Sequence, residues 1–450
     1  MLAPTPRYTA VSLRALLTLS APVMLSRLGI MTMGLVDTVV VGRHSSADLG
    51  YLALAWAPTG IVLTAAIGML QGIQVLTSQA IGAGHAVDTG AVLRRGLVYA
   101  FWVGCVAAAV LVLGGGPVLQ HIGLEASLGH GATPVLQTLA LSMLPIMLAD
   151  AGIFWLEAHG RAVPGMVCMW AANVVNLGLN LWLVPGRSGF AVEGAVASAW
   201  STGLSRTALL LFVAVAIIGW RQARGFGVFH RAPADPEAWQ RLRAIGYGAA
   251  ASYAIEASAF AGMTIVAGWL GVAAVASWAI ITNVMGVIFM ASVGLATSTA
   301  VLVGQACGAR NHLDVRRAGI LGFGTTAALM LIVSVAVSAG ASVIAAAYTH
   351  DVAVQRITAE ALWLAAWMFF IADGLQVVAA QSLRARGDIW LPAATHFFSY
   401  IAVLLPAGYV AAVTLQLGVD GIVWGITGAS AVAAALLLGR FAWLSRRVAA

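Results

Sequence analysis

Apolar segments long enough to cross a lipid bilayer follow one another along the whole chain, with short polar connections between them. As a helix rising about 1.5 Å per residue, roughly 20 apolar residues span the ~30 Å hydrocarbon layer. Gly and Pro occur within these segments and long alternating strand patterns are absent, which favours membrane helices over an outer-membrane barrel. The sequence therefore predicts an all-α integral membrane protein with about twelve transmembrane helices, at residues 14–41, 48–81, 91–114, 133–158, 163–184, 191–219, 241–270, 273–305, 316–347, 357–383, 389–414 and 420–444.

The composition agrees with a chain that is dissolved in a membrane. Hydrophobic residues make up 61% of the sequence and charged residues 9%, whereas a soluble protein needs roughly a quarter of its residues charged. Cytosolic enzymes and nucleic-acid binders are excluded on this ground, despite the net charge of +7. Cys105, Cys168 and Cys307 have no CxxC or Cys/His spacing, so they predict neither a disulfide framework nor a metal site.

Arginine residues gather at alternate connections between the predicted helices. Because connections rich in Arg stay on the cytoplasmic side of a membrane, the pattern predicts a multi-pass protein with both termini in the cytoplasm. The opposite connections hold only Arg43, Arg187 and Arg356. The connections assigned to the cytoplasm carry Arg7, Arg14, Arg94, Arg95, Arg161, Arg221, Arg224, Arg231, Arg241, Arg243, Arg310, Arg316, Arg317, Arg384, Arg386, Arg440, Arg446 and Arg447.

A polar stretch near the midpoint divides the chain into two similar halves. We predict a cytoplasmic linker at 220–240, between an N-terminal six-helix lobe at 1–219 and a C-terminal six-helix lobe at 241–450. Two parallel repeats of this kind enclose a central cavity near mid-membrane, and rocking of one half against the other gives alternating access. The repeated features are Gln79-Ala80-Ile81-Gly82-Ala83 with Gln305-Ala306-Cys307-Gly308-Ala309, Ala149-Asp150 with Ala372-Asp373, and Leu156 and Gly160 with Leu383 and Gly387.

Several acids lie within the predicted helices, where an ionised carboxylate costs roughly 2.5 to 3.5 kcal/mol on insertion scales and is a functional candidate by default. These acids are Asp37, Asp150, Glu256 and Asp373. Glu157 and Glu360 lie nearer to helix ends and are expected to reach the membrane interface. For Asp150 we expect an ion pair with Arg206, while Arg27 has no partner that the sequence assigns.

Asp37 is expected to meet the amides of the fifth predicted helix. Asn176 and Asn180 share one face of that helix at positions i and i+4, and Asn173 lies one turn before Asn176. A carboxylate with amide oxygens can coordinate a dehydrated Na⁺, or the acid can hold a proton. Two other interpretations remain open, namely an interfacial Asp37 and amides that only join helices by hydrogen bonds.

Glu256 and Asp373 have no basic partner on their own helices, and both are expected to face a wet cavity. If the two are neighbours, repulsion makes one carboxyl keep a proton near neutral pH unless a cation lies between them. That is the chemistry of an ion-coupled transporter. The alternative is two acids that Ser and backbone groups satisfy separately. His396 is expected to be a buried histidine with its hydrogen bonds satisfied.

These residues and motifs together resemble the multidrug and toxic compound extrusion (MATE) transporters along nearly the whole chain. The similar stretches are Gly34-Leu35-Val36-Asp37-Thr38, Gln79-Ala80-Ile81-Gly82-Ala83-Gly84, the amides Asn173, Asn176 and Asn180, and Val303-Gly304-Gln305-Ala306-Cys307-Gly308-Ala309. Glu256 and the run Ala372-Asp373-Gly374-Leu375-Gln376 are similar to the acidic pair of the NorM-type branch. Each motif is modest by itself, and their order along twelve predicted helices makes the resemblance specific.

The resemblance implies two cation sites. Asp37 with Asn176 and Asn180 corresponds to the first-half site where family members bind H⁺ or Na⁺, and Glu256 with Asp373 corresponds to a second-half site for the coupling cation, here assigned to Na⁺. One departure from the branch is Phe369, where some members carry a tyrosine. The residues predicted to line the substrate cavity are Asn173, Trp278, Phe369 and Gln376.

The predicted function is a secondary active multidrug efflux antiporter in a bacterial inner membrane. It would export organic cations or amphipathic drugs in exchange for Na⁺ or H⁺, as a monomer in contact with membrane lipid, without a cofactor and without nucleic acid. A lipid-linked precursor flippase of the wider superfamily is the alternative, although it predicts about fourteen helices and an arginine-lined cavity. An intramembrane aspartyl protease fits less well, because no Gly-x-Gly-Asp context is present. No Walker A sequence supplies ATP chemistry.

Overall fold

The computed structural model describes residues 10–121, 126–187, 189, 192–229 and 235–447, so that Arg7 and Arg231 of the predicted cytoplasmic set lie outside the described residues. Within these ranges the chain is helical and contains no β-strand. Eleven of its helical segments are long and apolar enough to cross a membrane, and α12 (Val352–Ala385), bent by 49° near its middle, makes a twelfth. The prediction of an all-α membrane protein with about twelve transmembrane helices is confirmed.

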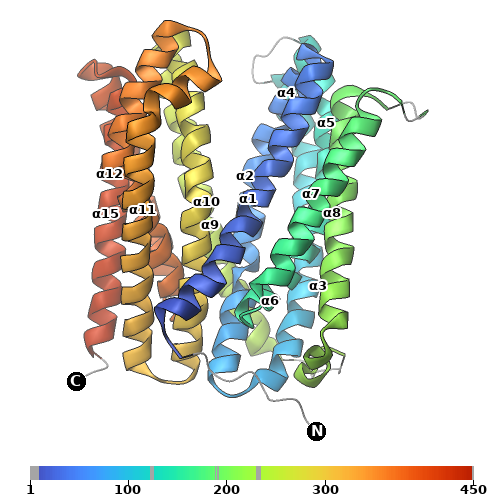
Figure 1. Cartoon of the computed structure of the whole chain (residues 1–450), viewed down its shortest axis with the longest axis vertical. Coiled ribbons are helices and arrows are strands. Elements are labelled where there is room, and N and C mark those ends of the chain that lie inside the picture. Colours follow the sequence, from blue (N-terminus) through green and yellow to red (C-terminus); the bar gives the residue numbers. More distant parts are fainter. Residues whose placement is uncertain (1–9, 122–125, 188, 190–191, 230–234, 448–450) are drawn as a thin grey trace. The chain divides into compact units, whose positions relative to one another are not determined.

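The described chain falls into two compact units (Figure 1). Residues 25–250 form the first unit, and residues 10–24 with 251–447 form the second; α1 (Leu13–His44) and α9 (Pro236–Trp269) contribute to both. The first unit also contains α2 (Ser46–Gly82), η1 (Ala86–Asp88), α3 (Thr89–Val110), η2 (Leu111–Gly115), α4 (Gly116–His121), α5 (Ala126–Leu141), α6 (Met143–Ala158), α7 (Ala162–Leu183), α8 (Gly194–Gly219) and η3 (Arg221–Phe226). The second unit also contains α10 (Val272–Gly308), α11 (His312–Tyr348), α12, α13 (Trp390–His396), η4 (Phe397–Leu404), α14 (Leu405–Tyr409), η5 (Val410–Thr414) and α15 (Gly418–Arg447).

In the first unit, α6 is the central helix. All but three of its residues are buried, and Trp155 is the largest of the fully buried side chains. The segment predicted as one helix at 133–158 is two helices, α5 and α6, which meet at Ser142. The Ser142 hydroxyl donates a hydrogen bond to the Leu139 carbonyl at 2.5 Å, so a side chain replaces part of the helical backbone pattern at this break.

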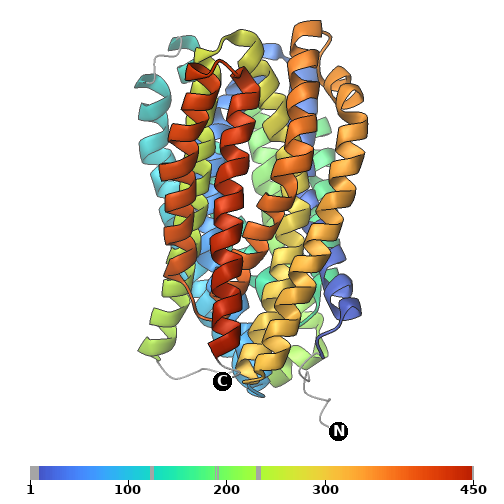
Figure 2. The same cartoon turned by 90° about the vertical axis from the view of Figure 1, so that its left-hand side faces the viewer.

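In the second unit, α12 is the central helix. It packs against α10, α11 and α15, which run beside it (Figure 2). The segment predicted at 389–414 alternates between α-helical and π-helical turns, with Pro406 at the start of α14. Because Pro has no backbone N–H, the regular hydrogen-bond pattern of an α-helix cannot continue unchanged through it.

Two helix ends that the predicted repeat relates to each other have the same backbone conformation. After Leu156 and after Leu383 the helix ends in the same turn, with the N–H five residues later donating back to that leucine carbonyl at 2.9 Å and 3.0 Å. Gly160 and Gly387 occupy the left-handed position of these turns, with φ of 72° and 89°. A side chain there would be strained, which accounts for glycine at both positions.

An aromatic cluster holds η3 against the end of α6. Trp155, His159, Trp220 and Phe226 stack on one another with ring centroids 4.2 to 6.2 Å apart, and the Arg161 guanidinium lies 4.6 Å from the Trp220 ring. Burial lowers the pKa of His159 to about 4, with a hydrogen bond to the Trp155 carbonyl acting in the opposite direction. The ring is therefore neutral at pH 7, and the start of the predicted linker is packed to the first unit.

Close approach of α2 and α9 depends on two glycines. A Cβ at Gly246 would overlap the Met69 carbonyl oxygen, and a Cβ at Gly72 would overlap the Leu242 carbonyl oxygen. Small residues of this kind let membrane helices approach closely, where van der Waals packing replaces the hydrophobic drive of water.

Gly246→Ala is expected to destabilise the first unit by about 1–3 kcal/mol, because backbone and not a flexible side chain stands in the way of the added methyl. The measurement is the unfolding temperature of the purified protein in detergent. Gly60→Ala is the matched control, since nothing lies within 4 Å of a Cβ at that helical position. An unchanged unfolding temperature for Gly246→Ala would contradict the close packing of α2 and α9.

Candidate ion-coupling sites

Asp37 lies at the centre of a buried polar cluster in the first unit. Its Oδ1 accepts hydrogen bonds from the amide nitrogens of Asn176, at 3.0 Å, and Asn180, at 2.8 Å. Its Oδ2 accepts one from the Thr202 hydroxyl at 2.5 Å. All four side chains are fully buried. The structure thus brings together three residues that the sequence singled out, and it adds Thr202 of α8.

The chemistry of this cluster follows from its donors. Each hydrogen bond to the carboxylate comes from an N–H or O–H donor, so these hydrogen bonds stabilise the carboxylate as an anion. The side-chain Oδ1 atoms of Asn176 and Asn180 have no hydrogen-bond partner among the described residues. A proton can bind to Asp37 with little rearrangement, whereas an Na⁺ ion would require both amides to turn their oxygens towards Asp37.

Asn173 has a different role from the other two amides. Its side-chain nitrogen donates to the carbonyls of Gly29, at 3.0 Å, and Met169, at 2.9 Å, so it joins α7 to α1 through backbone groups. This is the helix-joining role that the sequence left open for the amides. Its assignment to the substrate cavity stays a prediction.

A second buried group in the first unit is the ion pair of Arg27 and Glu157. The guanidinium donates to both carboxylate oxygens, at 3.1 Å and 3.2 Å, and Gln74 donates to the same carboxylate at 3.3 Å. The Phe154 ring lies 5.1 Å from the guanidinium. The expectation that Glu157 reaches the membrane interface is wrong, because α6 is central to the unit and Glu157 is 1% exposed. Glu360, for which the same expectation was made, is partly exposed and forms an ion pair with Arg356 at 2.9 Å.

Asp150 and Arg206 lie between these two groups without a direct ion pair. Arg206 donates to the Ser142 hydroxyl at 2.6 Å and lies 5.6 Å from the Trp56 ring. Neither carboxylate oxygen of Asp150 has a hydrogen-bond partner among the described residues, although Asp150 is fully buried. The expected ion pair of Asp150 and Arg206 is therefore not formed. The guanidinium donates instead to Ser142, a buried residue at the break between α5 and α6.

In the second unit, Glu256 and Asp373 are neighbours. The side-chain nitrogen of Gln376 donates to Asp373 Oδ1 at 3.2 Å and to Glu256 Oε1 at 3.4 Å. Because Gln376 lies three residues after Asp373, both project from the same face of α12. Two carboxylates that share one amide favour one proton or one cation between them. The Oε1 atom of Gln376 has no partner among the described residues and is a third oxygen for such a cation.

A buried arginine lies beside this acidic pair. Arg384 is 1% exposed, its guanidinium lies 5.7 Å from the Tyr253 ring, and it interacts electrostatically with Glu256. Sequence reasoning assigned Arg384 to a cytoplasmic connection and so missed it. His396 packs edge-on against Tyr400, with the ring centroids 5.7 Å apart, and forms a hydrogen bond with the backbone of Ser252. The expectation of a buried histidine is confirmed, since His396 is 2% exposed.

Two other residues predicted to line the substrate cavity are buried in the second unit. Trp278 is 1% exposed and donates to the Thr264 hydroxyl at 3.1 Å, and Phe369 packs edge-on against Phe370. Their roles with substrate stay predictions. Within the described residues no group of three or more His, Cys, Asp or Glu is placed to hold a metal ion.

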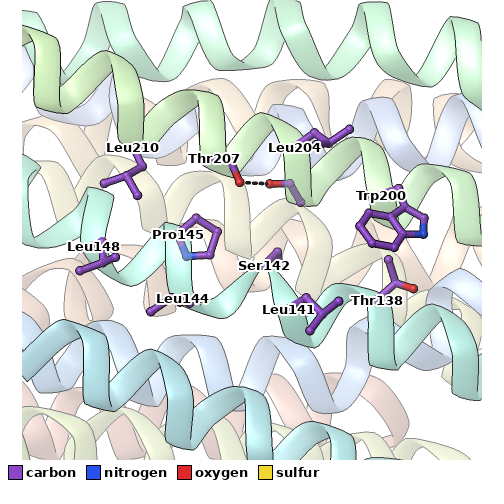
Figure 3. Close-up of a pocket in the computed structure, with 11 residues that line it drawn as sticks. Thr138, Leu141, Ser142, Leu144, Pro145, Leu148, Trp200, Leu204, Thr207 and Leu210 are labelled. Atoms are coloured by element: carbon purple, nitrogen blue, oxygen red, sulfur yellow. Dashed lines mark hydrogen bonds between the residues drawn. The ribbon is translucent and has the colours of Figure 1, made fainter.

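A pocket of about 320 Å³ lies in the first unit between α5, α6 and α8 (Figure 3). Leucines, Pro145 and Trp200 line it, together with the hydroxyl-bearing residues Thr138, Ser142 and Thr207. None of the predicted site residues belongs to this pocket. The candidate coupling sites are therefore the buried polar clusters and not this apolar pocket.

Comparisons with known proteins show the family of this chain. The MatE family model matches residues 22–182 and 249–410. A probable multidrug resistance protein NorM of Caulobacter vibrioides is 46% identical over 432 residues, which are 96% of this chain and 92% of that protein. The multidrug resistance protein PmpM of Pseudomonas aeruginosa is 29% identical over 444 residues, which are 93% and 89% of the two chains.

Solved structures show the same fold at low sequence identity. A MOP superfamily transporter from Pyrococcus furiosus has a TM-score of 0.88 at 18% identity, over 100% of this chain and 98% of that chain. The eukaryotic MATE transporter AtDTX14 has a TM-score of 0.86 at 17% identity, over 97% of both chains. The fold and the relatives define a membrane transporter and not an enzyme. The chain belongs to the MatE family, and its resemblance to the NorM-type branch is confirmed.

Proposed function

We propose that this protein is a multidrug efflux antiporter that expels organic cations or amphipathic drugs in exchange for H⁺ or Na⁺ by alternating access. The observation that carries the proposal is the sharing of one Gln376 amide by Glu256 and Asp373 in a buried site. One amide and the single guanidinium of Arg384 cannot neutralise two carboxylates, so this site needs one more proton or cation. The relatives that carry the name multidrug resistance protein support the substrate class.

The two candidate sites differ in the ion that their contacts favour. The N–H and O–H donors around Asp37 turn no amide oxygen towards it, so Na⁺ lacks these ligands there and H⁺ is the ion that fits this residue. Glu256 and Asp373 supply two neighbouring carboxylates for Na⁺, and the single amide of Gln376 adds its Oε1 as a ligand if it turns. The protein acts as a monomer in a bacterial inner membrane. Both of its termini lie in the cytoplasm, as the arginine distribution predicts.

The test is efflux of a fluorescent organic cation from liposomes under an imposed Na⁺ gradient and, separately, an imposed pH gradient. Glu256→Gln and Asp373→Asn are each expected to lower gradient-driven efflux by about tenfold or more, equivalent to about 1.4 kcal/mol or more of lost coupling. The matched control is Glu360→Gln, which removes a partly exposed acid from the same unit. Efflux by the wild-type protein that is independent of both gradients would contradict antiport and favour the flippase alternative.

A further inference from the structure

The buried charges in the interior of the first unit do not cancel. Its described charged side chains that are at most 4% exposed are three acids and two arginines: Asp37, Asp150, Glu157, Arg27 and Arg206. Their formal charges sum to +2 − 3 = −1. Since an uncompensated buried charge is strongly unfavourable, this group requires one additional positive charge. A single proton on any of the three carboxyls supplies it.

These five side chains are ordered along the helices. Arg27 and Asp37 are ten residues apart on α1, which is about 15 Å along a helix, and Asp150 and Glu157 are seven apart on α6, about 10 Å. Thr202, which contacts Asp37, lies one turn from Arg206 on α8. Electrostatic interactions join Asp37 to Arg206, Arg206 to Asp150, and Asp150 to both Arg27 and Glu157. Acids and arginines therefore alternate from Asp37 to Glu157.

Asp150 is the one acid of this series that no hydrogen bond holds. Asp37 accepts three hydrogen bonds and Glu157 accepts from Arg27 and Gln74, whereas both oxygens of Asp150 lack a partner among the described residues. A cavity of about 20 Å³ lies beside it, and Arg206 also lines this cavity. That volume is enough for one water molecule with polar partners.

The titratable groups that face Asp150 are two arginines and one acid. α1 presents Arg27, α8 presents Arg206, and α6 itself presents Glu157. The other side chains that line the cavity from α2 and α7 are Trp56, Leu63, Ile67 and Met169. Gly34 also lines it, one turn before Asp37 on α1. The cavity therefore reaches from Asp150 to the turn of α1 that precedes Asp37, and Asp37 itself does not line it.

We propose that Asp150 is a second binding site for the coupling proton in the first unit, exchanging that proton with Asp37 through water beside Arg206. Asp37 in its protonated form gives H⁺ to the water, and the water gives H⁺ to the Asp150 carboxylate. Asp37 becomes a carboxylate, Asp150 becomes a carboxylic acid, and Arg206 stays a cation throughout. The proposal rests on the proposed antiport and adds the path by which the proton leaves Asp37.

Arg206 couples the protonation states of Asp37 and Asp150. When Asp150 is ionised, it and Asp37 compete for the single guanidinium of Arg206, which at present donates to the neutral Ser142 hydroxyl. Protonation of either acid leaves the other to interact with Arg206. The two acids are therefore expected to be protonated alternately, as in other coupled pairs of titratable groups.

The test uses Asp150→Asn, which keeps the shape of the side chain and removes the proton site, and Asp150→Glu, which keeps a carboxyl. Infrared difference spectra of the purified full-length protein, recorded across a pH step in Na⁺-free buffer, detect the carbonyl stretch of protonated carboxyls. Asp150→Asn is expected to remove one such band, whereas Asp150→Glu is expected to move that band and keep it. If the asparagine variant does not fold, the band shift in the glutamate variant decides the question.

Transport supplies the second measurement. In pH-driven efflux, the pH of half-maximal rate is expected to shift by about one unit in Asp150→Asn, because the two acids are coupled. Asp150→Glu is expected to keep the wild-type profile. A wild-type profile together with an unchanged band in Asp150→Asn would overturn the proposal. The infrared bands require no transport, so failure of this proposal is distinguishable from failure of the antiport, in which the wild-type protein would show no gradient-driven efflux.

Discussion

Asp37→Asn is expected to abolish coupling through the first unit while the protein stays folded. Asparagine fits the same site, because its Oδ1 can accept from Asn176 and Asn180 and its Nδ2 can donate to the Thr202 hydroxyl, which turns to accept. The stability change is therefore limited to the difference between charged and neutral hydrogen bonds, about 1 kcal/mol. The proton site is lost completely, since an amide does not titrate near neutral pH.

The measurement is pH-driven efflux of a fluorescent cation from liposomes, with the unfolding temperature measured alongside. We expect efflux to fall to the level of protein-free liposomes and the unfolding temperature to change little. The matched control is Asp48→Asn, in which the changed carboxylate accepts from the backbone N–H of Ala195 near the start of α8. Wild-type efflux by Asp37→Asn would show that this carboxyl carries no coupling ion.

Arg27→Met is expected to cause the largest loss of stability. It removes the guanidinium that donates twice to Glu157 and leaves an acid that is 1% exposed with only Gln74 as a donor. Breaking a buried ion pair from one side costs about 3–5 kcal/mol, because the remaining charge stays desolvated. The double variant with Glu157→Gln removes both charges and leaves the net charge of the buried series at −1, so most of the stability should return.

A double-mutant cycle measures this effect through thermal unfolding in detergent. The expected coupling energy between Arg27 and Glu157 is about 3 kcal/mol or more, since each single variant leaves one member of the pair buried without its partner and the double variant removes both. The exposed pair of Arg356 and Glu360 is the control, and its coupling energy should not exceed about 1 kcal/mol. Additive effects of Arg27→Met and Glu157→Gln would contradict the ion pair.

The helices were predictable from the sequence because a bilayer requires a fixed length of apolar helix. The breaks within these helices were less predictable. The end of α5 depends on a hydrogen bond from Ser142 to the Leu139 carbonyl, and the π-helical turns of η4 lie before Pro406. Nothing in the hydropathy of these segments distinguishes an α-helical from a π-helical turn. The division of the units at residue 250 also falls within α9, a continuous helix.

The sites were predictable where one helix supplies the pattern. Asn176 and Asn180 share a face of α7 by spacing alone, and a buried acid such as Asp37 is rare enough to be noticed. Partners on other helices were not predictable, because contact depends on the depth and rotation of each helix. Thr202, the pairing of Arg27 with Glu157, and the bridging position of Gln376 all belong to this second group.

Movement of the coupling ion in response to a drug gradient tests the central claim most directly. Liposomes that contain the wild-type protein would be given an organic cation on one side only, with no imposed ion gradient, and internal pH and Na⁺ would be followed by fluorescent indicators. Antiport predicts that H⁺ or Na⁺ moves opposite to the drug, because coupling is reciprocal. The movement should disappear in the triple variant Asp37→Asn, Glu256→Gln and Asp373→Asn. Drug movement with no ion movement would contradict the account.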